Sequence, residues 1–409
     1  MIVILLSYTV FVTVTERNRQ VAYAASDELA VSVAPSLVAA KTKFGLRLFR
    51  ALAAEETTDN IFVSPLSIST ALLLTYNGAG GTTRDAIART LELSKLSLAT
   101  VNHDCMNLLA SLDQVDDHVD LFLGNALWMK DVFAPLVKDQ FLNTVMNSFN
   151  AEIFTRDFTD PQTLIDINSW VDEKTEGHIT NLIQTIDPEI VMFILNTLYF
   201  RGDWLIQFDE AETLTQPFFV SETETVNVEL MSTSGNFSYY ADEMFQAVRL
   251  PYGRGKLAMY IFLPSAGVTL PDFLANLNQT THEDYLNRLH PVSDLTVKLP
   301  KFRVEYGVKR LNSVLTQLGM GIAFDPVMAN LSGIAEPTIG NLFISFVDHK
   351  AIIEVTESGT EAAAATSVGI GLTAMPPDCV INRPFFFEIR DDRSGTILFM
   401  GQIMNPVQS

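Results

Sequence analysis

The 409-residue sequence has little cysteine, little positive charge and, beyond its first residues, no long apolar run. Two cysteines, Cys105 and Cys379, exclude a disulfide framework and an all-cysteine zinc site, so we expect two free thiols. Lys and Arg number 27 against 48 Asp and Glu, and the formal charge of −21 excludes a basic face for nucleic acid. Hydrophobic residues make up 48%, which is enough for a sizeable core.

The N-terminus carries an apolar stretch from Ile2 to Val14, too short for a helix that crosses a bilayer of roughly 30 Å. The stretch suits the apolar region of a secretory signal, and Ala22-Tyr23-Ala24 is a cleavage site of the A-x-A type before Ala25. No Lys or Arg precedes the stretch, which leaves a bare N-terminal extension as the alternative. We therefore predict a signal peptide or extension over residues 1–24 and one domain over 30–409. The protein would be secreted, or intracellular if the segment is no signal. Three sequons permit glycosylation in a secreted chain: Asn236, Asn278 and Asn330.

Helical and strand patterns divide along the chain. Residues 42–53, the charge-free run that opens at Ser64-Pro65, and residues 167–183 have helical character. Strand patterns dominate the second half, at residues 191–200, 245–250, 257–263, 295–299, 342–347, 351–355, 385–390 and 397–403. Helices early and strands late, without βαβ alternation, predict an α+β fold with antiparallel or mixed sheets.

Motifs for catalysis and for metal or cofactor binding are missing. The sequence has no H-E-x-x-H, G-x-S-x-G or P-loop motif, and its six histidines lack metal-ligand spacing. The stretch Gly369–Ala374 fits G-x-G-x-x-A but neither follows a βαβ strand nor opens a helix. We therefore expect no enzyme, no metal and no cofactor.

Residues 357–377 form an unusually long connection between strand patterns. From Thr360 to Leu372, alternate residues grow from small to large and suit burial, while the intervening residues stay small or polar. This alternation, without proline before Pro376, fits both an exposed loop and a central strand. The four alanines Ala362–Ala365 also fit an ordinary Ala-rich loop or short helix, and the pattern alone leaves the choice open.

Several motifs in order resemble the serpin family from about Ala40 to Pro406. They are Asn60–Ile68, Asn196–Trp204, Leu299–Phe302, His349–Ala351, Glu357–Thr366 and Asn382–Phe385. The resemblance implies three β-sheets, eight or nine helices and an exposed reactive-centre loop. It also implies suicide inhibition of serine proteases, sometimes cysteine proteases, by a monomer whose cleaved loop inserts into the central sheet while the protease stays covalently bound. The alternative is a non-inhibitory serpin that acts as a chaperone or ligand carrier.

The resemblance also implies roles for individual residues. The loop hinge corresponds to Glu357, Gly359, Thr360, Glu361, Ala362, Ala363, Ala364 and Ala365. The residues of the sheet-opening region correspond to Ser64, Ser67, Asn196, Trp204, Lys301 and His349. Among them, Glu357 and Lys301 resemble a salt-bridge pair beside Trp204. The plainer alternatives are two surface charges, a core aromatic and a satisfied buried histidine.

The scissile bond follows from the family's usual loop length. Seventeen residues counted inclusively from Glu357 place it at Thr373-Ala374, which suits an elastase-like protease. A shift by one residue would present Leu372 to a chymotrypsin-like enzyme, and Met375 is a weaker third choice. The loop has no Lys or Arg, so a trypsin-like target is not expected. Residues 96–120 are acidic and without Lys or Arg, so we expect no heparin site.

Overall fold

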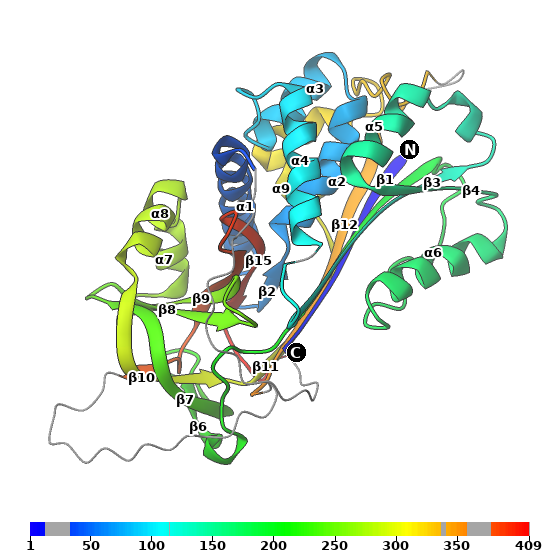
Figure 1. Cartoon of the computed structure of the whole chain (residues 1–409). Coiled ribbons are helices and arrows are strands. Elements are labelled where there is room, and N and C mark those ends of the chain that lie inside the picture. Colours follow the sequence, from blue (N-terminus) through cyan, green and yellow to red (C-terminus); the bar gives the residue numbers. More distant parts are fainter. Residues whose placement is uncertain (13–32, 114, 337–340, 358–377, 409) are drawn as a thin grey trace, which may run out of the picture.

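The computed structural model describes residues 1–12, 33–113, 115–336, 341–357 and 378–408 (Figure 1). Its described part contains two hydrogen-bonded β-sheets and nine α-helices. In sheet order, the six-stranded sheet consists of β11 (Phe302–Arg310), β12 (Ile344–Val355), β1 (Ile2–Val12), β5 (Met192–Gly202), β3 (Val119–Lys130) and β4 (Ala151–Arg156). The predicted α+β class is confirmed, and the candidate site lies on and beside this sheet.

The central strands β5 and β12 match sequence predictions with one change. β5 is buried along almost its whole length, as its β-branched and aromatic content predicts. The two strands predicted at residues 342–347 and 351–355 form the single strand β12. Asp348 and His349, which lie between the two predicted strands, are both buried within it.

The second sheet has nine strands. The resemblance implied three sheets, whereas the described strands form two, because strands expected in separate sheets are hydrogen-bonded into this one. Its order is β13 (Asp378–Val380), β10 (His290–Pro300), β7 (Thr225–Ala241), β8 (Phe245–Tyr252), β9 (Leu257–Pro264), β14 (Phe385–Asp391), β15 (Thr396–Ile403) and β2 (Ile61–Val63), with β6 (Leu214–Phe219) on β7. The 17-residue strand β7 pairs with β6 and β10 over most of its length and with β8 at its end, so the ladder is continuous. The predicted hairpin is present as β8 and β9.

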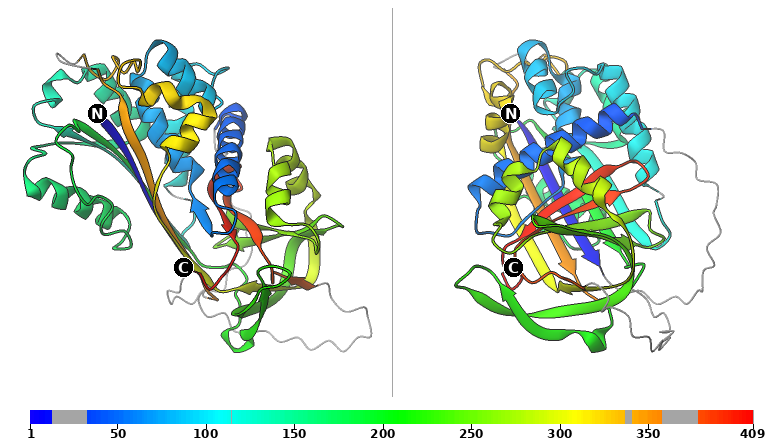
Figure 2. Two further views of the ribbon diagram at one scale, coloured as in Figure 1. Left: turned by 180° about the vertical axis from the view of Figure 1, so that it is seen from behind. Right: turned by 90° about the vertical axis from the view of Figure 1, so that its left-hand side faces the viewer.

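Helices cover both faces of the six-stranded sheet (Figures 1 and 2). The helices are α1 (Pro35–Glu55), α2 (Pro65–Gly78), α3 (Gly81–Thr90), α4 (Leu98–Leu112), α5 (Asp139–Phe149), α6 (Pro161–Lys174), α7 (Leu270–Asn276), α8 (Gln279–Arg288) and α9 (Asn312–Leu315). On one face, α2 packs against β5 and β1 and is buried on nearly all sides. On the other face, α6 packs its Ile167, Trp170 and Val171 against Phe193 and Leu195 of β5.

The helix predicted at residues 167–183 has different bounds. It begins at Pro161, where the Asp160 carboxylate accepts the backbone N–H of Gln162 at 2.9 Å, and it ends at Lys174. Gly177, at φ +83°, turns the chain and donates its N–H to the Asp172 carbonyl at 2.9 Å. Ile179 and Ile183, which the predicted range placed in the helix, pack against the sheet from an irregular segment.

The N-terminal segment Ile2–Val12 forms strand β1 at the centre of the six-stranded sheet (Figure 2). It pairs in parallel with β5 on one side and β12 on the other. Among the described residues no helix has the length and apolar character that a membrane crossing needs. The structure is that of the uncut chain, and the predicted cleavage before Ala25 lies outside the described residues, so the signal peptide stays a prediction.

Candidate functional site

The start of the predicted hinge is anchored by side chains. Glu357, two residues beyond the end of β12, is buried, and its Oε2 lies 3.1 Å from Lys301 Nζ. Its Oε1 accepts the Thr213 hydroxyl at 2.8 Å. Burial alone would raise the pKa of Glu357. Hydrogen bonds from its own backbone, Thr213 and Lys301 outweigh that effect and hold this pKa below its usual value. The carboxylate is therefore ionised and fixed at neutral pH.

Trp204 fixes the backbone just before Glu357. The indole N–H of Trp204 donates to the Thr356 carbonyl at 3.1 Å. The ring stacks on Tyr252 with centroids 4.4 Å apart and is 3% exposed. Lys301 lies between β10 and β11, where its N–H donates to the Glu229 carbonyl at 2.8 Å. The Glu357 side chain and the backbone of the preceding Thr356 are thus held by residues from separate parts of the chain.

Ser64 and Ser67 lie at the start of α2. Ser64 is the helix N-cap: its Oγ accepts the Ser67 N–H at 3.3 Å and donates to the Leu398 carbonyl of β15 at 2.6 Å. The start of α2 is therefore hydrogen-bonded to the second sheet. Ser67 Oγ, on the helix that packs against the six-stranded sheet, is buried and has no hydrogen-bond partner among the described residues.

Asn196 and His349 lie on the two strands that flank β1. Asn196 Nδ2 of β5 donates to Asn125 Oδ1 of β3 at 2.6 Å. Burial lowers the pKa of His349 to about 3, while a hydrogen bond to the Phe62 backbone acts in the opposite direction, so the imidazole is neutral. Both residues pair in register with Leu6 of β1. The structure therefore does not bring Asn196 and His349 together, because β1 passes between them.

The remaining site predictions fall outside the described residues. They are the hinge residues Gly359, Thr360, Glu361, Ala362, Ala363, Ala364 and Ala365, and the scissile-bond candidates Leu372, Thr373 and Ala374. Thr213 and Asn125 contact the site but were missed by sequence reasoning. Thr213 belongs to no motif, and Asn125 lies in β3, whose mixed polarity gave no strand signal.

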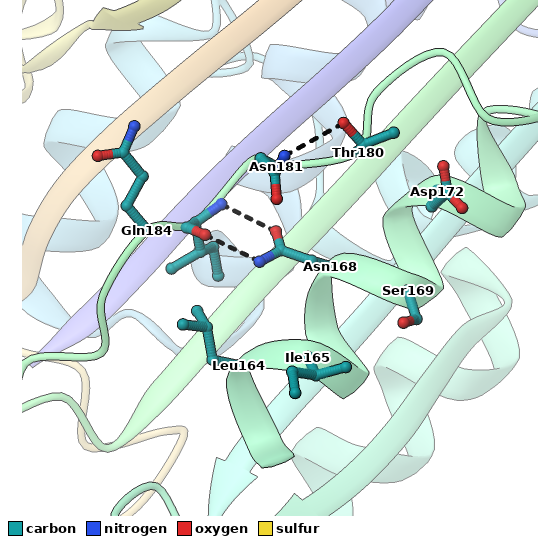
Figure 3. Close-up of a pocket in the computed structure, with 9 residues that line it drawn as sticks. Leu164, Ile165, Asn168, Ser169, Asp172, Thr180, Asn181 and Gln184 are labelled. Carbon is teal, nitrogen blue, oxygen red and sulfur yellow. Dashed lines mark hydrogen bonds between the residues drawn. The ribbon is translucent and has the colours of Figure 1, made fainter. Parts of the chain in front are cut away.

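A surface hollow of about 590 Å³ lies between α6 and residues 180–184 (Figure 3). The Asn168 side chain bridges its two walls, donating to the Ile183 carbonyl at 2.8 Å and accepting the Ile183 N–H at 3.0 Å. Asn168, Asp172, Thr180 and Gln184 give it a polar lining. None of the predicted site residues lines this hollow, and it assembles no catalytic group.

The described residues contain no cluster of three or more His, Cys, Asp or Glu side chains that could hold a metal ion. Cys105 and Cys379 are free thiols, as predicted, and both are buried. Burial raises the pKa of the Cys379 thiol to about 12, so it is inert at neutral pH. The sequon residues Asn236, Asn278 and Asn330 are exposed.

Comparison with known proteins identifies the family of this chain. The chain matches the family model "Serpin (serine protease inhibitor)" over residues 39–406. It is 34% identical to human Serpin B11 over 395 residues (91% of this chain, 100% of the relative). It is 33% identical to the leukocyte elastase inhibitor of Xenopus laevis over 385 residues (91% and 100%).

Two solved structures share the fold. The native thermophilic serpin tengpin superposes with a TM-score of 0.79 at 27% identity, over 96% of this chain and 97% of that one. Thyroxine-binding globulin in complex with thyroxine also gives 0.79, at 28% identity, over 91% and 100%. With a family match over most of its length, relatives above 30% identity and the same fold, this chain belongs to the serpin family.

Proposed function

We propose that this serpin is a suicide inhibitor of serine proteases. The protease attacks the loop that follows β12 and forms an acyl-enzyme, and the freed loop then enters the six-stranded sheet between β5 and β12. The observation that carries the proposal is the anchored hinge: Glu357 is clamped by Lys301 and Thr213 at the end of β12, where such a loop has to start. An insertion of about 14 residues spans roughly 45 Å of strand, enough to carry a bound protease across the molecule.

The loop sequence supports a protease that cleaves after a small or apolar residue. Residues 358–377 contain no Lys or Arg, so an acidic specificity pocket would find no cation. Cleavage after Thr373 suits an elastase-like protease and cleavage after Leu372 a chymotrypsin-like one. The leukocyte elastase inhibitor among the relatives supports the first choice.

The test is covalent capture, with the chain that begins at Ala25 incubated separately with elastase, chymotrypsin and trypsin. A band on a denaturing gel at the summed masses is expected with elastase or chymotrypsin and absent with trypsin. Mass spectrometry of the released C-terminal fragment then gives the cut bond, which we expect to leave Ala374 as the new N-terminus. Clean cleavage by all three proteases without any covalent band would instead favour the non-inhibitory alternative, such as ligand binding, which thyroxine-binding globulin among the solved structures exemplifies.

A further inference from the structure

The position that a cleaved loop would need is occupied by the chain's own N-terminus. β1 is a central strand with neighbours on both sides, in register with β5 from Ile2 to Phe11 and with β12 from Ile2 to Val12. At its start, the Ile2 N–H donates to the Phe343 carbonyl at 2.8 Å, and the Met1 carbonyl accepts the Val191 N–H at 3.0 Å. The gap between β5 and β12 is therefore one strand wide and filled.

The sequence of β1 suits burial on both faces. Residues 1–12 contain no Pro, Lys, Arg, Asp or Glu. Ile2 and Ile4 are fully buried in the core on the α2 side, while Val3 is fully buried with Phe193 and Ile352 on the α6 side. A mostly apolar sequence without charged residues is typical of parallel strands covered on both faces, so this segment fits the gap chemically as well as geometrically.

β1 and an inserted loop exclude each other. The loop leaves the end of β12, so on entering the gap it must turn back and run antiparallel to β12, whereas β1 runs parallel to it. Val12 lies beside Val355, two residues before the anchored Glu357. β1 thus fills the gap up to the level at which the hinge would have to enter.

We propose that residues 2–12 are a built-in competitor of the reactive loop. While they occupy the gap, the loop of a cleaved molecule has no place to insert, and the protease completes hydrolysis and leaves. Release of the segment from between β5 and β12 opens the gap and activates the inhibitor. This inference rests on the proposed inhibitory function, because it assigns the N-terminus a role in controlling that same insertion site.

A reversible cross-link tests the occupancy without reference to inhibition. Ser7 and Lys350 are in-register neighbours on β1 and β12, so Ser7→Cys with Lys350→Cys in the full chain should oxidise to a disulfide. Peptide mapping by mass spectrometry identifies that bond, and the single variant Ser7→Cys is the control. Failure of the properly folded double variant to cross-link would overturn the proposal.

The functional arm measures the rate of covalent complex formation with elastase or chymotrypsin, whichever the chain captures. The oxidised double variant should be cleaved as a substrate without forming complex. Reduction of its disulfide should restore complex formation to the rate of the unaltered full chain in the same reductant. Thr9→Pro, which removes a ladder N–H within β1, should form complex roughly tenfold faster or more than the unaltered full chain, since the rate scales with the fraction of open gaps. Thr15→Pro, three residues after Val12 in the sequence, is the control and should match the unaltered full chain.

The chain that begins at Ala25 separates the two proposals. If it captures protease and the full chain does so at least roughly tenfold more slowly, both proposals stand. Equal rates for the two chains would overturn the competitor role and leave the inhibitory function intact. Absence of capture in every form, even where the cross-link forms, would overturn the inhibitory function and the competitor role with it.

Discussion

Lys301, between β10 and β11, and Glu357, two residues beyond the end of β12, form an ion pair with Nζ 3.1 Å from Oε2. The two ends of the pair differ in environment, because the Glu357 side chain is 7% exposed and the Lys301 side chain 33%. Lys301 also lies 3.5 Å from Glu229, whose side chain is 64% exposed. The pair therefore joins a buried, hydrogen-bonded carboxylate to a cation that water still reaches.

The first prediction concerns this anchor. Glu357→Ala should lower the free energy of unfolding by about 1 kcal/mol, since Lys301 is partly screened by water and the lost contacts are one ion pair, the Thr213 hydroxyl bond and the bond from the Glu357 backbone. Glu229→Ala is the matched control and should change stability by less than about 0.5 kcal/mol. Urea unfolding measures both. Equal effects of the two substitutions would contradict a specific role for Glu357.

The indole of Trp204 provides a second test. Trp204→Phe keeps an aromatic ring near Tyr252 but removes the hydrogen bond to the Thr356 carbonyl, which should cost about 1 kcal/mol beyond the loss of indole packing. Trp128→Phe is the matched control, because the buried indole N–H of Trp128 has no hydrogen-bond partner among the described residues. Denaturant unfolding of both variants gives the difference. A larger loss in Trp128→Phe would count against the anchoring contact.

His349 gives a pH dependence with a definite sign. Its pKa is about 3 in the folded protein, below the ordinary value of about 6.5 for the unfolded chain. Between these values the unfolded state binds the extra proton, so stability falls as pH falls, by up to about 1.4 kcal/mol per pH unit. Between pH 7 and pH 5, the free energy of unfolding measured with urea should fall by about 2 kcal/mol more in the unaltered protein than in His349→Gln. If the free energy of unfolding changed with pH in the same way in both proteins, His349 would not contribute to the pH dependence of stability.

The hinge sequence predicts an asymmetry between adjacent residues. Thr360 belongs to the alternating set suited to burial, and Glu361 to the other. In the chain that begins at Ala25, Thr360→Arg should convert the inhibitor into a substrate, because a buried arginine obstructs insertion. Glu361→Arg should retain most covalent complex on a denaturing gel. The prediction fails if the two variants partition alike between complex and cleaved product.

Sequence reasoning succeeded where one local signal determined the structure. Ser64-Pro65 predicted a helix start because a capping hydroxyl and a proline suit those two positions. The pair Glu357 and Lys301 came from the family resemblance, and the structure places the two in contact. Their role in switching stays a prediction.

Other elements depend on packing that local sequence does not encode. β3 contains Asp120, Asn125 and Lys130, and its strand character comes from pairing with β5. Ile2–Val12 was interpreted as part of a signal peptide because such a signal and a doubly buried parallel strand both require an apolar run without charge. The strand is defined by its pairing with β5 and β12, which the sequence of the segment does not encode, and the signal peptide stays a prediction.

The most direct test of loop insertion is the melting temperature of the chain that begins at Ala25, before and after a single cut in residues 358–377. If the cut loop enters between β5 and β12, the nicked protein gains a central strand and should melt clearly above the intact one. A nicked protein that melts at or below the temperature of the intact protein would contradict insertion and, with it, the inhibitory mechanism.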